Sequence, residues 1–167
     1  LKDDQEPDFT VRPATHDDAP QLVAWDNYYA QTRLLSTVRD EAQWRYEVDG
    51  RSDTATFKAN IGIIMNKQGE DVGYAAVRVS PENDFCGVFG YVVGEKSSYL
   101  ATFSDVMRWC KHLRDTTEQK KPSTTIRFDS GVHEMVHELA RRSRLGIRYD
   151  STYAWYLRVP DLPAFIQ

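Results

Sequence analysis

The sequence predicts a mixed α/β fold of the α+β type, with a central, mostly antiparallel sheet and helices on both faces. Two observations predict it. Three apolar runs, 59–65, 72–79 and 85–93, are separated only by short polar connections, the pattern of an antiparallel meander. After them, helical and strand-like segments alternate, which is typical of a mixed sheet covered by helices.

The composition is that of one globular domain. The chain has 167 residues, of which 41% are hydrophobic and 28% charged, so a disordered chain is excluded. The net charge is −4 and the basic residues are scattered, so we expect no nucleic-acid or membrane partner. No apolar run reaches the roughly 20 residues of a membrane span and the acidic start is unlike a signal peptide, which predicts a cytoplasmic protein. Cys86 and Cys110 are predicted to be buried free thiols.

The first half of the chain predicts one strand and two helices before the meander. Residues 9–12 alternate in polarity and stop at Pro13, as a strand does. Thr15 is a helix N-cap candidate, followed by an acidic first turn and helical periodicity as far as Tyr29. A second, short amphipathic helix follows Asp40 and ends at Gly50.

The second half predicts two further helices and two strands. Apolar residues recur at helical spacing over 99–116, and 124–128 is strand-like. A helix over 132–144 and a strand over 151–159, rich in Tyr and Trp, come last. We therefore expect a disordered or extended segment over 1–8, one domain over 9–159, and an exit linker over 160–167, which contains Pro160 and Pro163.

Two segments carry a resemblance to a known family. Residues 9–18, Phe-Thr-Val-Arg-Pro-Ala-Thr-His-Asp-Asp, resemble the opening strand and helix of the GCN5-related N-acetyltransferase (GNAT) superfamily. Residues 71–78 resemble its third strand, and the likeness in layout extends to about Val159. The resemblance implies a GNAT-like fold, acetyl-CoA as the cofactor without a metal, and a small-molecule or peptide amine as the acceptor.

A finer resemblance concerns residues 37–45 and 153–163. They are similar to the second GNAT-like lobe of tandem acetyltransferases of the enhanced-intracellular-survival type, in which the final strand leads into a sterol-carrier-like domain. This likeness implies that the chain is a fragment or relative of a larger protein with neighbouring domains.

The cofactor loop departs from the family pattern, which is an Arg or Gln followed by Gly-x-Gly or Gly-x-Ala before a helix. Glycines there let backbone amides approach a pyrophosphate. The corresponding segment, 92–100, holds one glycine and the repelling Glu95. Two interpretations stay open: an acetyltransferase with an eroded loop, or a non-catalytic scaffold lobe. The candidate cofactor residues are Val93, Gly94, Lys96, Ser97 and Ser98, although Ser97 or Ser98 could equally be an N-cap.

Candidates for proton transfer are Tyr91, Asp129 and Tyr153, each predicted near a strand end. The alternative for each is structural: a packed tyrosine with a satisfied hydroxyl, or an aspartate that caps a helix. Other residues are candidates for the walls of such a site, and core packing is the alternative role for them. Gly87 and Gly90 indicate a bulge in their strand, and candidates for an acceptor pocket are Trp25, Tyr28, Tyr29 and Tyr46.

A zinc hydrolase is the third hypothesis. The motif His133-Glu134-x-x-His137 on a predicted helix would place two imidazoles one turn apart, with Glu134 as general base. The charged Glu138 that follows is unusual for such helices, and the third ligand would have to be Asp150 or Asp161. The apolar residues of this helix favour a structural role.

Overall fold

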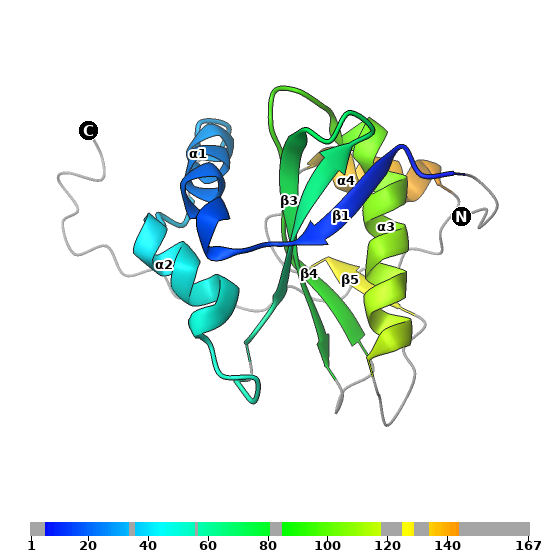
Figure 1. Ribbon diagram of the computed structural model, residues 1–167. Helices are drawn as coiled ribbons and strands as arrows, with labels where there is room; N and C mark the ends of the chain where they lie inside the picture. Colours follow the sequence, from blue (N-terminus) through cyan, green and yellow to red (C-terminus); the bar gives the residue numbers. More distant parts are fainter. Residues whose placement is uncertain are drawn as a thin grey trace, which may run out of the picture.

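The computed structural model describes residues 6–33, 36–55, 57–80, 85–117, 125–128 and 134–143. Figure 1 shows its strands and helices. In chain order they are β1 (Phe9–Pro13), the 3-10 turn η1 (His16–Asp18), α1 (Ala19–Ala30), α2 (Glu41–Arg45), the π turn η2 (Tyr46–Gly50), β2 (Asn60–Asn66), β3 (Asp71–Ser80), β4 (Phe85–Val93), α3 (Tyr99–Thr116), β5 (Ile126–Phe128) and α4 (Glu134–Arg142). The predicted strand 151–159 and linker 160–167 lie outside the described residues.

The sheet has five strands in the order β1-β2-β3-β4-β5. All neighbours are antiparallel except β4 and β5, which are parallel, so the predicted meander within a mixed sheet is confirmed. The pairing of β3 with β4 shifts by one residue between Ala76 and Val77, which leaves Phe89 as the extra residue of a bulge. This bulge lies between Gly87 and Gly90, where the glycines indicated one.

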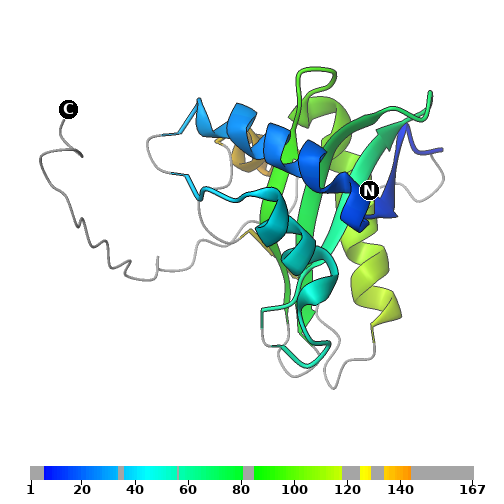
Figure 2. The same cartoon turned by 60° about the vertical axis from the view of Figure 1, so that its left-hand side comes forward.

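Helices cover both faces of the sheet, as predicted (Figure 2). On one face, α3 and α4 pack on residues such as Val77 and Val88. On the other face, α1 and α2 contribute Leu22 and Trp44, which pack against Ile63 and its neighbours.

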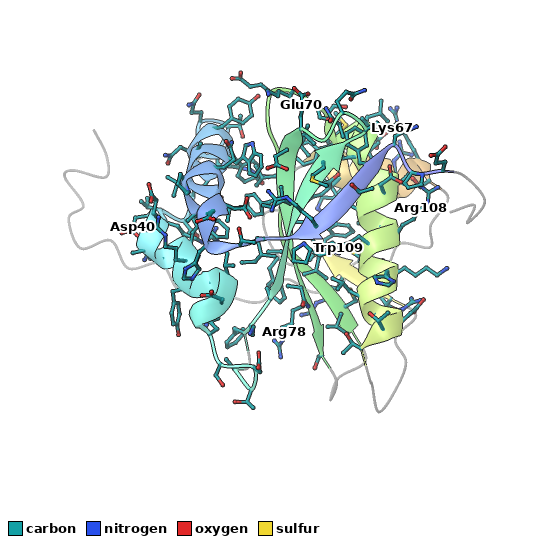
Figure 3. All side chains as sticks on the ribbon, in the orientation of Figure 1. Asp40, Lys67, Glu70, Arg78, Arg108 and Trp109 are labelled. Carbon is teal, nitrogen blue, oxygen red and sulfur yellow. The ribbon has the colours of Figure 1, made fainter. Side chains whose placement is uncertain are left out.

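Polar residues begin these helices: Asp40, marked in Figure 3 at the start of α2, accepts a hydrogen bond from the amide of Gln43 at 2.8 Å. None of the described helices is long and apolar enough to cross a bilayer.

An ion-pair cluster joins β1 to the start of α1 and to β3. The guanidinium of Arg12 donates hydrogen bonds to both carboxylate oxygens of Asp18, at 2.8 and 2.7 Å, and to Asp71 at 2.8 Å. The amide of Thr15 also donates to Asp18, at 2.7 Å. Hydrogen bonding by Arg12 lowers the pKa of Asp18 to about 2 from its ordinary 3.8.

A buried polar cluster holds α1 and the chain before α2 against β3. The hydroxyl of Tyr74, a residue with 3% of its surface exposed, donates to the carboxylate of Asp26 at 2.5 Å. Arg39 donates to the other carboxylate oxygen at 2.9 Å and stacks over the Trp44 ring at 4.7 Å. Burial raises the pKa of Asp26 above its ordinary value, because it outweighs the hydrogen bonds from Tyr74 and Arg39, which lower this pKa. The carboxylate therefore depends on both partners.

We predict that Asp18→Asn reduces stability in a pH-dependent way. Because the folded-state pKa of Asp18 lies below its unfolded value, its contribution is present above about pH 4 and disappears as the pH falls towards 2. Urea unfolding at pH 7 should show a loss of about 1 to 2 kcal/mol in the free energy of unfolding, and the difference from wild type should vanish near pH 2. The matched control is Asp17→Asn at the exposed neighbouring position. A constant difference at all pH values would contradict the prediction.

We predict that Tyr74→Phe destabilises the domain by about 1.5 to 3 kcal/mol, because a buried carboxylate loses a hydrogen-bond donor. Thermal and urea unfolding measure the change. Tyr46→Phe is the control, since Tyr46 is 54% exposed, and it should change the free energy of unfolding by less than about 0.5 kcal/mol. Equal effects of the two substitutions would show that the Asp26 cluster does not stabilise the fold.

Candidate functional site

A cavity of about 480 Å³ opens where four parts of the chain meet. They are the end of α1, the connection between β4 and α3, the first turn of α3, and α4. Its walls are mostly aromatic and aliphatic, with a few hydroxyl and charged groups. The lining residues are Tyr28, Tyr29, Thr32, Val93, Gly94, Ser97, Ser98, Tyr99, Leu100, Met135, Glu138, Leu139 and Arg142.

The cavity borders an open edge of β4. Strand β5 pairs with β4 only from Cys86 to Val88, and no other described strand pairs with that edge further along. The amide of Gly94 donates to the carbonyl of Val72 in β3, at 2.8 Å. Since backbone groups alternate sides along a strand, Tyr91 and Val93 direct theirs away from β3. The end of β4 therefore presents outward N–H and C=O groups beside the cavity.

The first turn of α3 forms the next wall. Ser98 is its N-cap, because the hydroxyl oxygen accepts from the amide of Ala101 at 3.2 Å, so the capping interpretation is confirmed for this serine. The helix is 18 residues long, and its first N–H groups have no partner within the helix. Ser97 and Ser98 both line the cavity. This end of α3 is suited to a negatively charged group.

Gly94 is required by close packing. A Cβ atom at this position would lie 2.7 Å from the indole Nε1 of Trp25, a buried residue of α1. The single glycine of this connection thus lets α1 approach the end of β4. Any larger side chain would displace Trp25 or the connection itself.

Charged groups at the cavity differ from those that the sequence indicated. Lys96 is not among the lining residues; its ammonium lies 3.7 Å from Glu70, which Figure 3 marks in the turn between β2 and β3. Among the described lining residues the cation is Arg142 of α4, which pairs with Glu138 at 2.6 Å. Arg33, after the end of α1, stacks on the lining Tyr29 at 4.6 Å.

Of the candidates for proton transfer, the structure describes Tyr91. Its side chain is buried and its hydroxyl hydrogen-bonds with Thr102 at 2.6 Å. Burial raises the pKa of Tyr91 well above its ordinary value, so the phenol stays protonated at neutral pH. Asp129 and Tyr153 lie outside the described residues.

The aromatic candidates separate into two groups. Tyr28 and Tyr29 line the cavity, whereas Tyr46 packs with Arg51 and is not among the lining residues. Sequence reasoning missed several wall residues, which come from the two helices α3 and α4 and from Thr32 after α1. The sequence held no signal for them, because only the structure shows that Leu100 and Met135 remain 71% and 45% exposed although each belongs to a helix that packs on the sheet.

The zinc hypothesis rests largely on residues outside the described part. His137 lies on α4, while His133, Asp150 and Asp161 are not described. Among the described residues, no group of three His, Cys, Asp or Glu side chains is placed to hold a metal ion.

Comparisons with known proteins support the fold. No family model matches the sequence, and no curated protein matches it. Solved structures do match. A ribosomal-protein-alanine N-acetyltransferase from Brucella melitensis biovar Abortus 2308 superposes with a TM-score of 0.61 at 16% identity, over 90% of this chain and 99% of that one.

Two further structures show the range of proteins with this architecture. An aminoglycoside acetyltransferase from an uncultured soil metagenomic sample, in complex with sisomicin, has a TM-score of 0.58 at 8% identity, over 91% of this chain and 97% of that one. A transcriptional regulator from Bacillus halodurans C-125 has a TM-score of 0.64 at 12% identity, over 89% and 99%. At these identities the likeness establishes the fold alone, and it confirms the GNAT-like mixed sheet predicted from the sequence.

Proposed function

We propose that this chain is an acyl-CoA-dependent N-acetyltransferase of the GNAT type, with acetyl-CoA in the cavity between α1, the β4–α3 connection and α4. One observation carries the proposal: the open edge of β4 and the first turn of α3 meet at the same cavity. An extended amide-containing chain needs backbone partners, and a diphosphate needs N–H groups and positive charge. The two features supply these needs side by side.

The residues present fit this cofactor. The outward backbone groups of Tyr91 and Val93 are suited to its amide-containing chain, and the first turn of α3 to its diphosphate. Arg142 stands at the cavity wall in an ion pair with Glu138, so it could serve the diphosphate by exchanging that partner, in a connection that carries the exposed Glu95 and lacks the glycine-rich pattern. When bound, acetyl-CoA supplies an acetyl group activated as a thioester. The protein's part is to orient that group and to exclude water from it.

The acceptor is proposed to be an amine of a small molecule or a peptide. This rests on neighbours of the same fold whose names specify a ribosomal-protein alanine and an aminoglycoside as their substrates. The proton would pass from the amine through a water or a side chain. Tyr91 is a poor base because its hydroxyl is engaged by Thr102, so Asp129 and Tyr153 remain the proposed candidates. Such an enzyme would act in the cytoplasm, where acetyl-CoA is available.

A non-catalytic scaffold lobe of a larger tandem protein is the second candidate function. The absence of a glycine-rich pattern from residues 92–100 favours it, and so does the engaged hydroxyl of Tyr91. Under this alternative the chain would shape the site of a neighbouring domain of the enhanced-intracellular-survival type and would not hold acetyl-CoA itself. Binding of acetyl-CoA distinguishes the two functions.

We predict that acetyl-CoA stabilises the purified protein. At a concentration about 100 times its Kd, binding of acetyl-CoA adds about 2.7 kcal/mol to the free energy of unfolding, a rise in Tm of roughly 5 to 10 °C.

Leu100→Glu should lower the affinity for acetyl-CoA roughly five- to tenfold, because it adds a negative charge beside the diphosphate. An acidic residue at this position in the first turn is compatible with the helix.

The matched control is Leu100→Gln, which has the same size as the glutamate variant without its charge. Leu100 is 71% exposed, so neither substitution should unfold the protein. Isothermal titration calorimetry measures both affinities. No shift in Tm at millimolar acetyl-CoA would support the scaffold lobe, and equal affinities of the two variants would remove the diphosphate from the first turn of α3.

A further inference from the structure

The side chain of Tyr99 takes the hydrogen-bonding position on the open edge of β4. Its hydroxyl donates to the carbonyl of Tyr91 at 3.3 Å, and the backbone amide of Val93 faces the same hydroxyl and lowers the pKa of the phenol. Tyr91 and Val93 are the residues beyond the β5 pairing whose backbone groups point away from β3. The phenol therefore lies at the place where a further strand or an extended ligand would pair, and it already binds the outward carbonyl of Tyr91.

The ring of Tyr99 is held as well as its hydroxyl. It packs edge-on against the ring of Tyr91, with 5.1 Å between centroids, and it forms part of the cavity wall. Burial raises the pKa of the Tyr99 phenol to about 12, so the hydroxyl is protonated and able to donate at neutral pH. Tyr99 is the first residue of α3, so rotation of its side chain alone can move the phenol without moving the helix.

We infer that the side chain of Tyr99 acts as a gate. In the free protein it occupies the place of the ligand on the edge of β4, and it must rotate away when an extended, amide-containing arm binds there. The inference rests on the proposed function, because it concerns the cofactor arm in the same cavity. The contact satisfies the outward carbonyl of Tyr91, which would otherwise lack a strand partner among the described residues. It also lowers the affinity for the arm, since the ligand has to replace bonds that already exist.

The test compares wild type with Tyr99→Phe, which keeps the ring and removes the hydroxyl. Titration calorimetry should show that the variant binds acetyl-CoA about two- to tenfold more tightly, the effect of one competing hydrogen bond. ADP carries a diphosphate without the pantetheine arm, and its affinity should be the same for both proteins. Tyr46→Phe, which removes a hydroxyl outside the cavity, should match wild type with both ligands.

A second measurement needs no ligand. In the free protein the amide of Val93 should exchange with solvent about fivefold faster in Tyr99→Phe than in wild type, because the hydroxyl oxygen that faces this amide is removed. Unchanged exchange at Val93 would overturn the gate. So would an equal or weaker affinity of Tyr99→Phe for acetyl-CoA, which would mean that the hydroxyl does not compete with the ligand.

The failure of the proposed function has a different signature. In that case neither wild type nor Tyr99→Phe would bind acetyl-CoA, whatever the exchange of Val93, and the gate would be overturned together with the cofactor. Binding of acetyl-CoA by both proteins, without a gain in the variant, would overturn the gate alone.

Discussion

The site depends on where the backbone of β4 stops pairing with β5. Up to Val88 the strand has neighbours on both sides, and beyond the bulge at Phe89 the described part of the chain provides a strand on one side only. Backbone N–H and C=O groups inside a protein need partners, so the freed edge has to be covered or used. The cavity, the position of Tyr99 and the proposed binding of an extended ligand all follow from this separation.

The rest of the fold fixes the walls around that edge. Tyr28 and Tyr29 lie at the end of α1, the same helix that Asp26 ties to β3 through Tyr74. The opposite wall is α4, which packs on α3 through the apolar residues Val136 and Leu139. A change in the buried Asp26 cluster therefore acts on the cavity through the position of α1, although it lies on the other face of the sheet from α3.

The elements were more predictable from the sequence than the site. The meander and the helix 99–116 were predicted correctly because alternating and helical periodicities are local signals that the core then stabilises. Arg142 and Ser98 line the same cavity only because α4 packs beside α3, and neither sequence segment contains a pattern that predicts this packing. Lys96 was expected beside the cofactor, but its pairing with Glu70 is set by a turn 26 residues earlier in the chain. The predictions for Asp129, Tyr153 and the last strand stay predictions.

The close approach of Trp25 to Gly94 has a practical consequence. An indole ring lies directly beneath the connection that leads into α3, with its ring nitrogen turned to the only glycine there. Tryptophan emission responds to nearby charge and to the polarity of its surroundings. Trp25, one of the chain's four tryptophans, is thus placed to respond to occupancy of the adjoining cavity through its own emission, without any attached dye.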